Sequence, residues 1–311
     1  MGNKEKNFVS AIVYVYNAEK RIGNFLDTII SILEENFDYS EIICVNDSST
    51  DDSLAVIKKT SLKATTSVSI INMSYFHGLE IAMNAGRDLS IGDFVFEFDN
   101  TILDFPKEEI MKVYKRSLQG YDIVSAVPDK TEKLTSKLFY SIFDKFTDLS
   151  YEMHTESFRI LSRRVINRIS SMNKTIPYRK AIYASQGLKT DVLKYKITME
   201  SHIKEDKTER RYKSGLAIDS LILFTELGYR FSMAMTAFMM LMSVFMVIYS
   251  IVIFATQNPV AGWTTTILFL SMAFFGLFGI LTIIIKYLQL LVNLVFKRKY
   301  YSFEGIEKLT Q

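Results

Sequence analysis

The feature that most constrains this chain is a long stretch without charge near its carboxyl end. From Phe231 to Ile285 the sequence contains no Asp, Glu, Lys, Arg or His, and a polar turn at 256–263 divides the stretch in two. Each part, about 231–255 and about 264–285, is long enough to cross the roughly 30 Å hydrocarbon core of a bilayer as a helix. The sequence therefore predicts a two-helix transmembrane hairpin.

Basic residues flank the predicted hairpin on both sides. Arg210, Arg211 and Arg230 precede it, Lys286 and 297–299 follow it, and the turn between the helices carries no charge. The positive-inside rule then places both chain ends in the cytosol and the turn outside. We expect a multi-pass protein of the cytoplasmic (inner) membrane.

The rest of the chain is ordinarily polar, which predicts a cytosolic domain ahead of the hairpin. The formal net charge of +3 is too small to indicate a nucleic-acid partner, and no nucleic-acid-binding motif is present. Cys44 is the only cysteine, so no disulfide forms within the chain, and we expect its thiol to be buried in a strand.

Strand and helix patterns alternate over the first 128 residues. β-branched and aromatic runs predict strands at 9–15, 41–45, 67–73, 94–98 and 121–127. Apolar residues at helical spacing predict helices at 21–33, around 54–57, at 78–89 and at 108–118. This alternation indicates an α/β domain with a mainly parallel sheet.

Two of the predicted strands end in acidic, hydroxyl-rich turns. Asp99 follows the strand 94–98, and Asp47 and Ser49 follow the strand 41–45. Ligands of open α/β sheets bind beyond the carboxyl ends of the strands. We therefore expect one polar site that is formed by both strand ends.

The segment 129–229 is expected to present a second substrate to this site, ahead of a membrane unit at 230–311. Its part 130–146 has an apolar helical face with lysines beside it. This helix either packs on its own domain or lies in the membrane interface, and the nearby apolar stretch favours the interface. The alternation of strand and helix patterns resumes at 158–166, which predicts a strand running into a helix. Basic residues cluster at 178–180 and 204–213.

Several segments, in order and spacing, resemble glycosyltransferase family 2. The segments are 13–19, 41–53, 78–86 and 92–99. The segment 158–163 resembles the acceptor-side motif of the polyprenyl-phosphate branch, which includes bactoprenol glucosyltransferases and dolichyl-phosphate mannosyltransferase. The segments 286–288 and 298–301 resemble the tail of the bactoprenol type, so the resemblance covers nearly the whole chain.

The resemblance implies a GT-A fold, with a Rossmann-like, mainly parallel sheet, and an inverting enzyme. Such an enzyme would move one sugar from a nucleotide-sugar, a UDP-sugar, to polyprenyl (undecaprenyl) phosphate for modification of a cell-envelope glycan. A homo-oligomer formed through the spans is also implied. Two alternatives remain open: a family 2 enzyme with another lipid-linked or glycan acceptor, and a non-catalytic donor-binding or scaffold protein of the membrane.

The resemblance also implies roles for individual residues. Asp99 and Arg159 would be catalytic. The donor would be bound by Tyr16, Asn17, Glu19, Asp47, Ser49, Gly78 and Asp99. The acceptor phosphate would be bound by Arg159, Ser162, Arg211 and Tyr212.

Mg²⁺ or Mn²⁺ is the implied cofactor, with Asp99 and Thr101 as its ligands. Thr101 stands where the family has a second carboxylate, and one carboxylate with a hydroxyl suits Mg²⁺ poorly. Glu97 and Asp104 are the acidic residues that could substitute. Other polar residues are expected to be structural or solvated: Arg163, Arg164, Arg179 and the three histidines.

Overall fold

The computed structural model describes residues 4–129, 139–141, 155–171, 178–185, 187–198, 207–224, 262–296 and 302–310, with isolated positions between 231 and 248. The chain divides into two compact units. The first contains residues 1–216 and 297–311, and the second contains residues 217–296. The first unit therefore takes in segments from both sides of the charge-free stretch.

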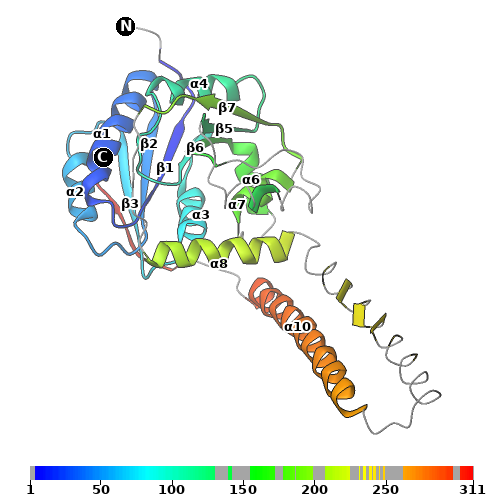
Figure 1. Ribbon diagram of the computed structural model, residues 1–311. Helices are drawn as coiled ribbons and strands as arrows, with labels where there is room; N and C mark the ends of the chain where they lie inside the picture. The colour runs from blue at the N-terminus through cyan, green and yellow to red at the C-terminus, as the bar shows by residue number, and fades with distance from the viewer. Residues whose placement is uncertain are drawn as a thin grey trace. The chain divides into compact units, whose positions relative to one another are not determined.

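A single mixed sheet organises the first unit, with strand order β7-β5-β6-β4-β1-β2-β3-β8 (Figure 1). Four neighbouring strands are parallel: β3 (Ser67–Met73), β2 (Ser40–Asn46), β1 (Val9–Val15) and β4 (Phe94–Phe98). Beyond β4, β6 (Phe158–Ser162) is antiparallel to both β4 and β5 (Ile123–Pro128), and β7 (Thr190–Tyr195) is parallel to β5. The strands predicted from sequence are confirmed, whereas β7 was not predicted.

Helices cover both faces of the sheet (Figure 1). One face packs against α1 (Glu19–Asn36), α2 (Ser53–Ser61) and α4 (Glu108–Ser117). The other packs against α3 (Leu79–Leu89), α6 (Arg163–Ser171) and α7 (Arg179–Ser185). Because both faces are covered, all seven residues of the central strand β1 are buried.

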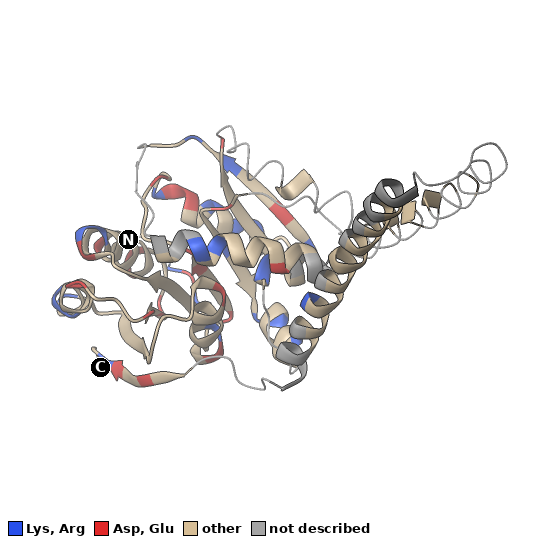
Figure 2. Ribbon diagram, turned by 60° about the horizontal axis from the view of Figure 1, so that its bottom comes forward, with Lys and Arg blue, Asp and Glu red and all other residues tan. Residues whose placement is uncertain are grey.

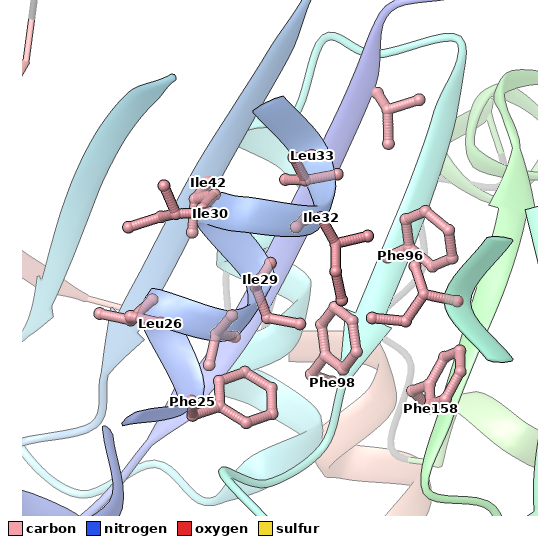
Figure 3. Close-up of a cluster of buried hydrophobic side chains, with 14 of the residues drawn as sticks. Phe25, Leu26, Ile29, Ile30, Ile32, Leu33, Ile42, Phe96, Phe98 and Phe158 are labelled. Carbon is pink, nitrogen blue, oxygen red and sulfur yellow. The ribbon is translucent and has the colours of Figure 1, made fainter. Parts of the chain in front are cut away.

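The core beneath α1 is rich in aromatic and branched side chains (Figure 3). The buried face of α1 repeats at helical spacing through Ile22, Phe25, Leu26, Ile29 and Leu33. The rings of Phe25 and Phe98 meet edge to face with centroids 5.3 Å apart. Cys44 lies in this core, and burial raises the pKa of its thiol to about 12, so it is the inert buried thiol that was predicted.

The eighth strand, β8 (Phe303–Lys308), was not predicted from sequence. It pairs antiparallel with β3, with Ile306 opposite Ile71. Its residues alternate between half-buried and exposed, so its sequence lacks the apolar run of a central strand. This strand covers the edge that β3 would otherwise leave open.

Two further helices in the described part of the chain are α8 (Lys207–Phe224) and α10 (Gly262–Phe296). Within the second unit, Lys286 Nζ of α10 lies 2.8 Å from Asp219 Oδ1 of α8. Apart from Lys286, α10 carries no Lys, Arg, Asp or Glu, and much of the helix is tan in Figure 2. Among the described residues, no helix combines the length and apolarity needed to cross a membrane.

Two predicted membrane elements lie mostly outside the described residues. Of the amphipathic helix 130–146, only 139–141 are described, and these are helical. Of the first span, 231–255, only isolated helical positions are described. The segment of the second predicted span is helical, and its helix continues beyond residue 285 to Phe296. The two-helix hairpin stays a prediction.

Candidate active site

The polar turn after β2 is fixed by Asp47, whose side chain is fully buried. Its carboxylate accepts hydrogen bonds from the backbone N–H groups of His77 and Gly78, each at 2.8 Å, and from the Tyr14 hydroxyl at 3.0 Å. Burial raises the pKa of Asp47, although these hydrogen bonds oppose the rise. Asp47 therefore ties the end of β2 to the turn that begins α3.

The loop after β1 is held to the loop after β2 by reciprocal hydrogen bonds. The Asn17 N–H donates to Ser49 Oγ at 3.1 Å, and the Thr50 N–H donates to Asn17 Oδ1 at 2.9 Å. The Glu19 N–H donates to Asp51 Oδ2 at 2.9 Å. The predicted donor-binding residues of these two loops thus lie together at one edge of the sheet.

Asp99 lies at the same edge, at the end of β4, and is paired with Arg159 of β6. Arg159 Nη2 donates to Asp99 Oδ2 at 2.6 Å, Nη1 donates to Glu97 Oε2 at 2.9 Å, and Nε donates to Glu156 Oε2 at 2.7 Å. The Arg159 side chain is only 1% exposed. In this arrangement the three carboxylates occupy the whole guanidinium of Arg159.

A second buried arginine, Arg179 of α7, contacts two of the same carboxylates, those of Asp99 and Glu97. Its Nη2 donates to Asp99 Oδ1 at 2.8 Å, and its Nη1 lies 2.9 Å from Glu97 Oε2. Its Nε and its backbone N–H both donate to Glu80 Oε2 on α3, at 2.9 and 2.8 Å. The interpretation of Arg179 as a solvated cation was wrong, because its side chain is completely buried.

Opposite charges keep this network ionised despite its burial. Burial opposes the ionisation of Asp99, but the guanidinium groups of Arg159 and Arg179 outweigh it and hold the pKa of Asp99 far below its usual value. Burial likewise opposes ionisation of Glu156, whose pKa is lowered by Arg159 and Lys180. Lys180, beside Arg179 on α7, is itself 9% exposed.

Tyr212 of α8 packs against the Gly78 turn. Its ring meets Phe76 edge to face with centroids 5.9 Å apart, and its hydroxyl accepts a hydrogen bond from the Glu80 N–H at 3.4 Å. Gly78 has φ +84°, and a Cβ at this position would overlap the Tyr212 ring. Glycine is therefore required here both by the backbone and by the close approach of α8.

The predicted acceptor residues are not all brought together. Because β6 runs antiparallel to β4, Arg159 pairs with Glu97 near the site, whereas Ser162 pairs with Phe94 at the opposite end of β4. The Ser162 hydroxyl donates to Asp122 there, at 3.2 Å. Arg211 is exposed on α8, next to Tyr212.

The residues around Asp99 do not fit a divalent cation in this arrangement. Both carboxylate oxygens of Asp99 accept hydrogen bonds from guanidinium groups, and Thr101 offers no second carboxylate. Asp104, the suggested substitute, accepts the Tyr195 hydroxyl at 2.9 Å, and Glu97 is bound by the two arginines. Within the described ranges, no group of three or more His, Cys, Asp or Glu side chains is arranged to hold a metal ion.

Four members of this network were missed in the sequence: Glu80, Glu156, Arg179 and Tyr183, whose hydroxyl donates to Glu97 Oε1 at 3.0 Å. Glu80 and Arg179 are 99 residues apart in the chain. A signal was present for Glu80, which stands two residues after the glycine of a recognised motif. No local pattern marked Glu156 or the two residues of α7.

Comparison with known proteins assigns the family. Residues 10–173, more than half of the chain, match the family described as Glycosyl transferase family 2. An uncharacterised glycosyltransferase of Synechocystis is 29% identical over 58% of this chain and 58% of its own length. A prophage bactoprenol glucosyl transferase homologue of Escherichia coli is 28% identical over 60% of this chain and 62% of its own length. The chain thus spans about three fifths of the length of these relatives.

A solved structure supports the same fold. It is the glucosyl-3-phosphoglycerate synthase of Mycobacterium tuberculosis in complex with Mn²⁺, UDP-glucose and phosphoglyceric acid, with a TM-score of 0.51 and 14% identity. The likeness covers 70% of this chain and 79% of the other, and it shows a GT-A fold. The sheet, its helices and the matched family together show that this chain belongs to glycosyl transferase family 2.

Proposed function

We propose that this glycosyltransferase moves a single sugar from a UDP-sugar to polyprenyl phosphate, for modification of a cell-envelope glycan. The observation that carries the proposal is the contact of Tyr212 with the Gly78 turn. Tyr212 lies on α8, the helix that leads toward the charge-free stretch, and Asp47 fixes the turn at the donor edge of the sheet. We therefore assign the acceptor phosphate to a position beside Tyr212, next to the donor.

The chemistry makes modest demands on this site. A phosphate monoester is already anionic near pH 7, so it needs little help from a general base. The enzyme has to bring two anions together and to stabilise the departing nucleoside diphosphate. Guanidinium groups match phosphate oxygens in geometry and charge, and Arg159 and Arg179 both lie at the end of β4.

We assign the roles that the placement of the residues supports. The donor-binding set Tyr16, Asn17, Glu19, Asp47, Ser49, Gly78 and Asp99 forms the donor side, with Asp47 acting through the turn that it fixes. Arg211 and Tyr212 are assigned to the acceptor phosphate, and Ser162 is not, because it lies at the other end of β4. The bactoprenol glucosyl transferase homologue of Escherichia coli supports the choice of acceptor.

The proposal includes a two-helix membrane hairpin with both ends in the cytosol. Its support is the absence of charge between Phe231 and Ile285 and the exposed apolar side chains of α10, among them Phe274, Phe278 and Leu288. Cysteine labelling of intact cells tests it. Native Cys44 is fully buried, so a membrane-impermeant maleimide should label Asn258→Cys and leave Lys4→Cys unlabelled. Labelling of Lys4→Cys in intact cells, or labelling of Asn258→Cys only after the membranes are disrupted, would contradict the topology.

Transfer by the purified full-length chain in detergent tests the activity. We would supply undecaprenyl phosphate and a panel of labelled UDP-sugars and would extract the lipid product. One UDP-sugar should give a labelled lipid, and Asp99→Asn should abolish it. The matched control is Asp27→Asn, an exposed carboxylate on α1, which should leave the rate unchanged.

If no sugar is transferred to undecaprenyl phosphate, two further results distinguish the alternative functions. Transfer to another lipid-linked or glycan acceptor, but not to undecaprenyl phosphate, would establish the related enzyme. UDP binding without transfer to any acceptor would favour a donor-binding or scaffold protein. Size measurement of the detergent complex by light scattering tests the implied homo-oligomer.

A further inference from the structure

We infer that Arg179 holds the position on Asp99 that a divalent cation would take, and that this chain binds its nucleoside diphosphate without a metal. The inference rests on the proposed UDP-sugar donor. Its starting point is that Asp99 Oδ1 accepts from Arg179 Nη2 at 2.8 Å while Oδ2 accepts from Arg159 Nη2 at 2.6 Å. A cation could ligate Asp99 only after a guanidinium had left.

The surrounding carboxylates cannot replace Asp99 as a metal ligand. Glu80 accepts two hydrogen bonds from Arg179, and Glu156 accepts one from Arg159. Glu97 lies between the two guanidinium groups and also accepts the Tyr183 hydroxyl. Each of these side chains is buried and pairs with an arginine rather than facing open space.

The geometry of Arg179 leaves one group available for a ligand. Nη1 is buried and lies 2.9 Å from Glu97 Oε2, yet it makes no hydrogen bond of acceptable geometry. A buried N–H group without an aligned acceptor is uncommon and costs free energy. A phosphate oxygen could satisfy it after a small shift of the guanidinium, because arginine binds phosphate and carboxylate in the same forked geometry.

Asp99 is the carboxylate that a phosphate can displace. Its side chain is 10% exposed, whereas those of Glu80 and Glu97 are 3% and 0% exposed. When a phosphate oxygen replaces the Asp99 carboxylate oxygen on Arg179, the guanidinium still has an anionic partner. Lys180, on the same helix, adds a further positive charge beside Asp99, whose pKa it helps to lower.

UDP binding to the purified full chain, measured by calorimetry in excess Mg²⁺ and in EDTA, tests the inference. The UDP affinities of the wild type in Mg²⁺ and in EDTA should agree within about threefold. This is a difference in binding free energy below about 1 kcal/mol, since a tenfold change in affinity corresponds to about 1.4 kcal/mol. UDP itself chelates Mn²⁺, so the comparison is with UDP alone: addition of the protein to Mn²⁺ and UDP should not lower the magnetic resonance signal of free Mn²⁺ any further. A tenfold loss of UDP affinity in EDTA, or stoichiometric Mn²⁺ uptake, would overturn the inference.

Substitutions of Arg179 test whether this residue is responsible for UDP binding without a metal. Arg179→Gln should weaken UDP binding at least tenfold in EDTA, and Arg179→Lys, which keeps the charge, should retain part of the affinity if the first variant fails to fold. Arg164→Gln is the matched control, because Arg164 is exposed and pairs with Asp122 away from the site. Equal UDP affinity of Arg179→Gln and Arg164→Gln would refute the role of Arg179.

The two proposals fail separately. Metal-independent UDP binding without sugar transfer would sustain the role of Arg179 and refute the proposed transfer. Sugar transfer that requires Mg²⁺ would sustain the transfer and refute the role of Arg179.

Discussion

Arg179 Nη2 donates to Asp99 Oδ1 at 2.8 Å, and the two residues are 80 positions apart in the chain. The contact joins α7, on one face of the sheet, to the end of the central strand β4. Because Arg159 binds the other oxygen of Asp99, the carboxylate is fixed from two sides. The end of β4 is therefore a rigid, charge-paired centre, and its members can be tested individually.

Glu97→Gln should destabilise the first unit strongly. Glu97 is completely buried and is the carboxylate that both Arg159 and Arg179 approach at 2.9 Å. Glutamine keeps the shape but removes the charge, and breaking a buried ion pair costs about 3–5 kcal/mol of unfolding free energy. Urea unfolding measures the change. Glu108→Gln, an exposed residue in the first turn of α4, is the control and should change stability by less than about 0.5 kcal/mol.

Gly78→Ala should be more costly than Gly120→Ala, although both glycines have a positive φ of nearly the same value. The φ values are +84° and +87°, so both substitutions carry backbone strain of about 1–3 kcal/mol. Only at Gly78 does the added Cβ meet Tyr212, since nothing lies within 4 Å at Gly120. In urea unfolding, Gly78→Ala should therefore lose more unfolding free energy than Gly120→Ala. Equal losses would mean that α8 does not press on the turn.

Thr310→Val tests the attachment of the carboxyl-terminal segment to β3. The Thr310 hydroxyl accepts from the Val68 N–H at 2.7 Å and donates to the Thr66 carbonyl at 3.0 Å. Valine has the same shape but leaves both backbone groups without this partner, at a cost of about 1–3 kcal/mol. Hydrogen exchange of the Val68 amide should accelerate. Lys58→Ala removes only the exposed pair with Glu307, and its effect should stay below about 1 kcal/mol.

The stability that Asp122 contributes should depend on pH. Burial opposes its ionisation, but hydrogen bonds from Arg164 and the Lys189 N–H hold the pKa of Asp122 below its usual value. The contribution is therefore complete above the unfolded-state pKa of about 3.9 and is lost as the pH falls through the lower folded-state pKa. The difference in unfolding free energy between wild type and Asp122→Asn should be constant from pH 7 to 5 and should narrow below about pH 4. A difference that is independent of pH would contradict the ion pair.

The sequence predicted the parts of the site that depend on local pattern. Asp47 and Asp99 follow apolar strands, and parallel strands bring their carboxyl ends to one edge, so both were placed correctly at that edge. Ser162 was grouped with Arg159 because they are close in sequence, but an antiparallel strand separates them along its length. Arg179 could not be identified as a site residue, because its partners lie on α3 and at the end of β4. No pattern near residue 179 indicates them.

The pairing of β8 with β3 imposes an order on the maturation of this protein. Ribosomes make β3 early, but its edge partner at 303–308 emerges only after the whole charge-free stretch has been synthesised. An open strand edge is a template for pairing with other chains, and nascent domains carry that hazard until they close. The pairing of β8 with β3 therefore completes the sheet only after the most apolar part of the polypeptide has been synthesised.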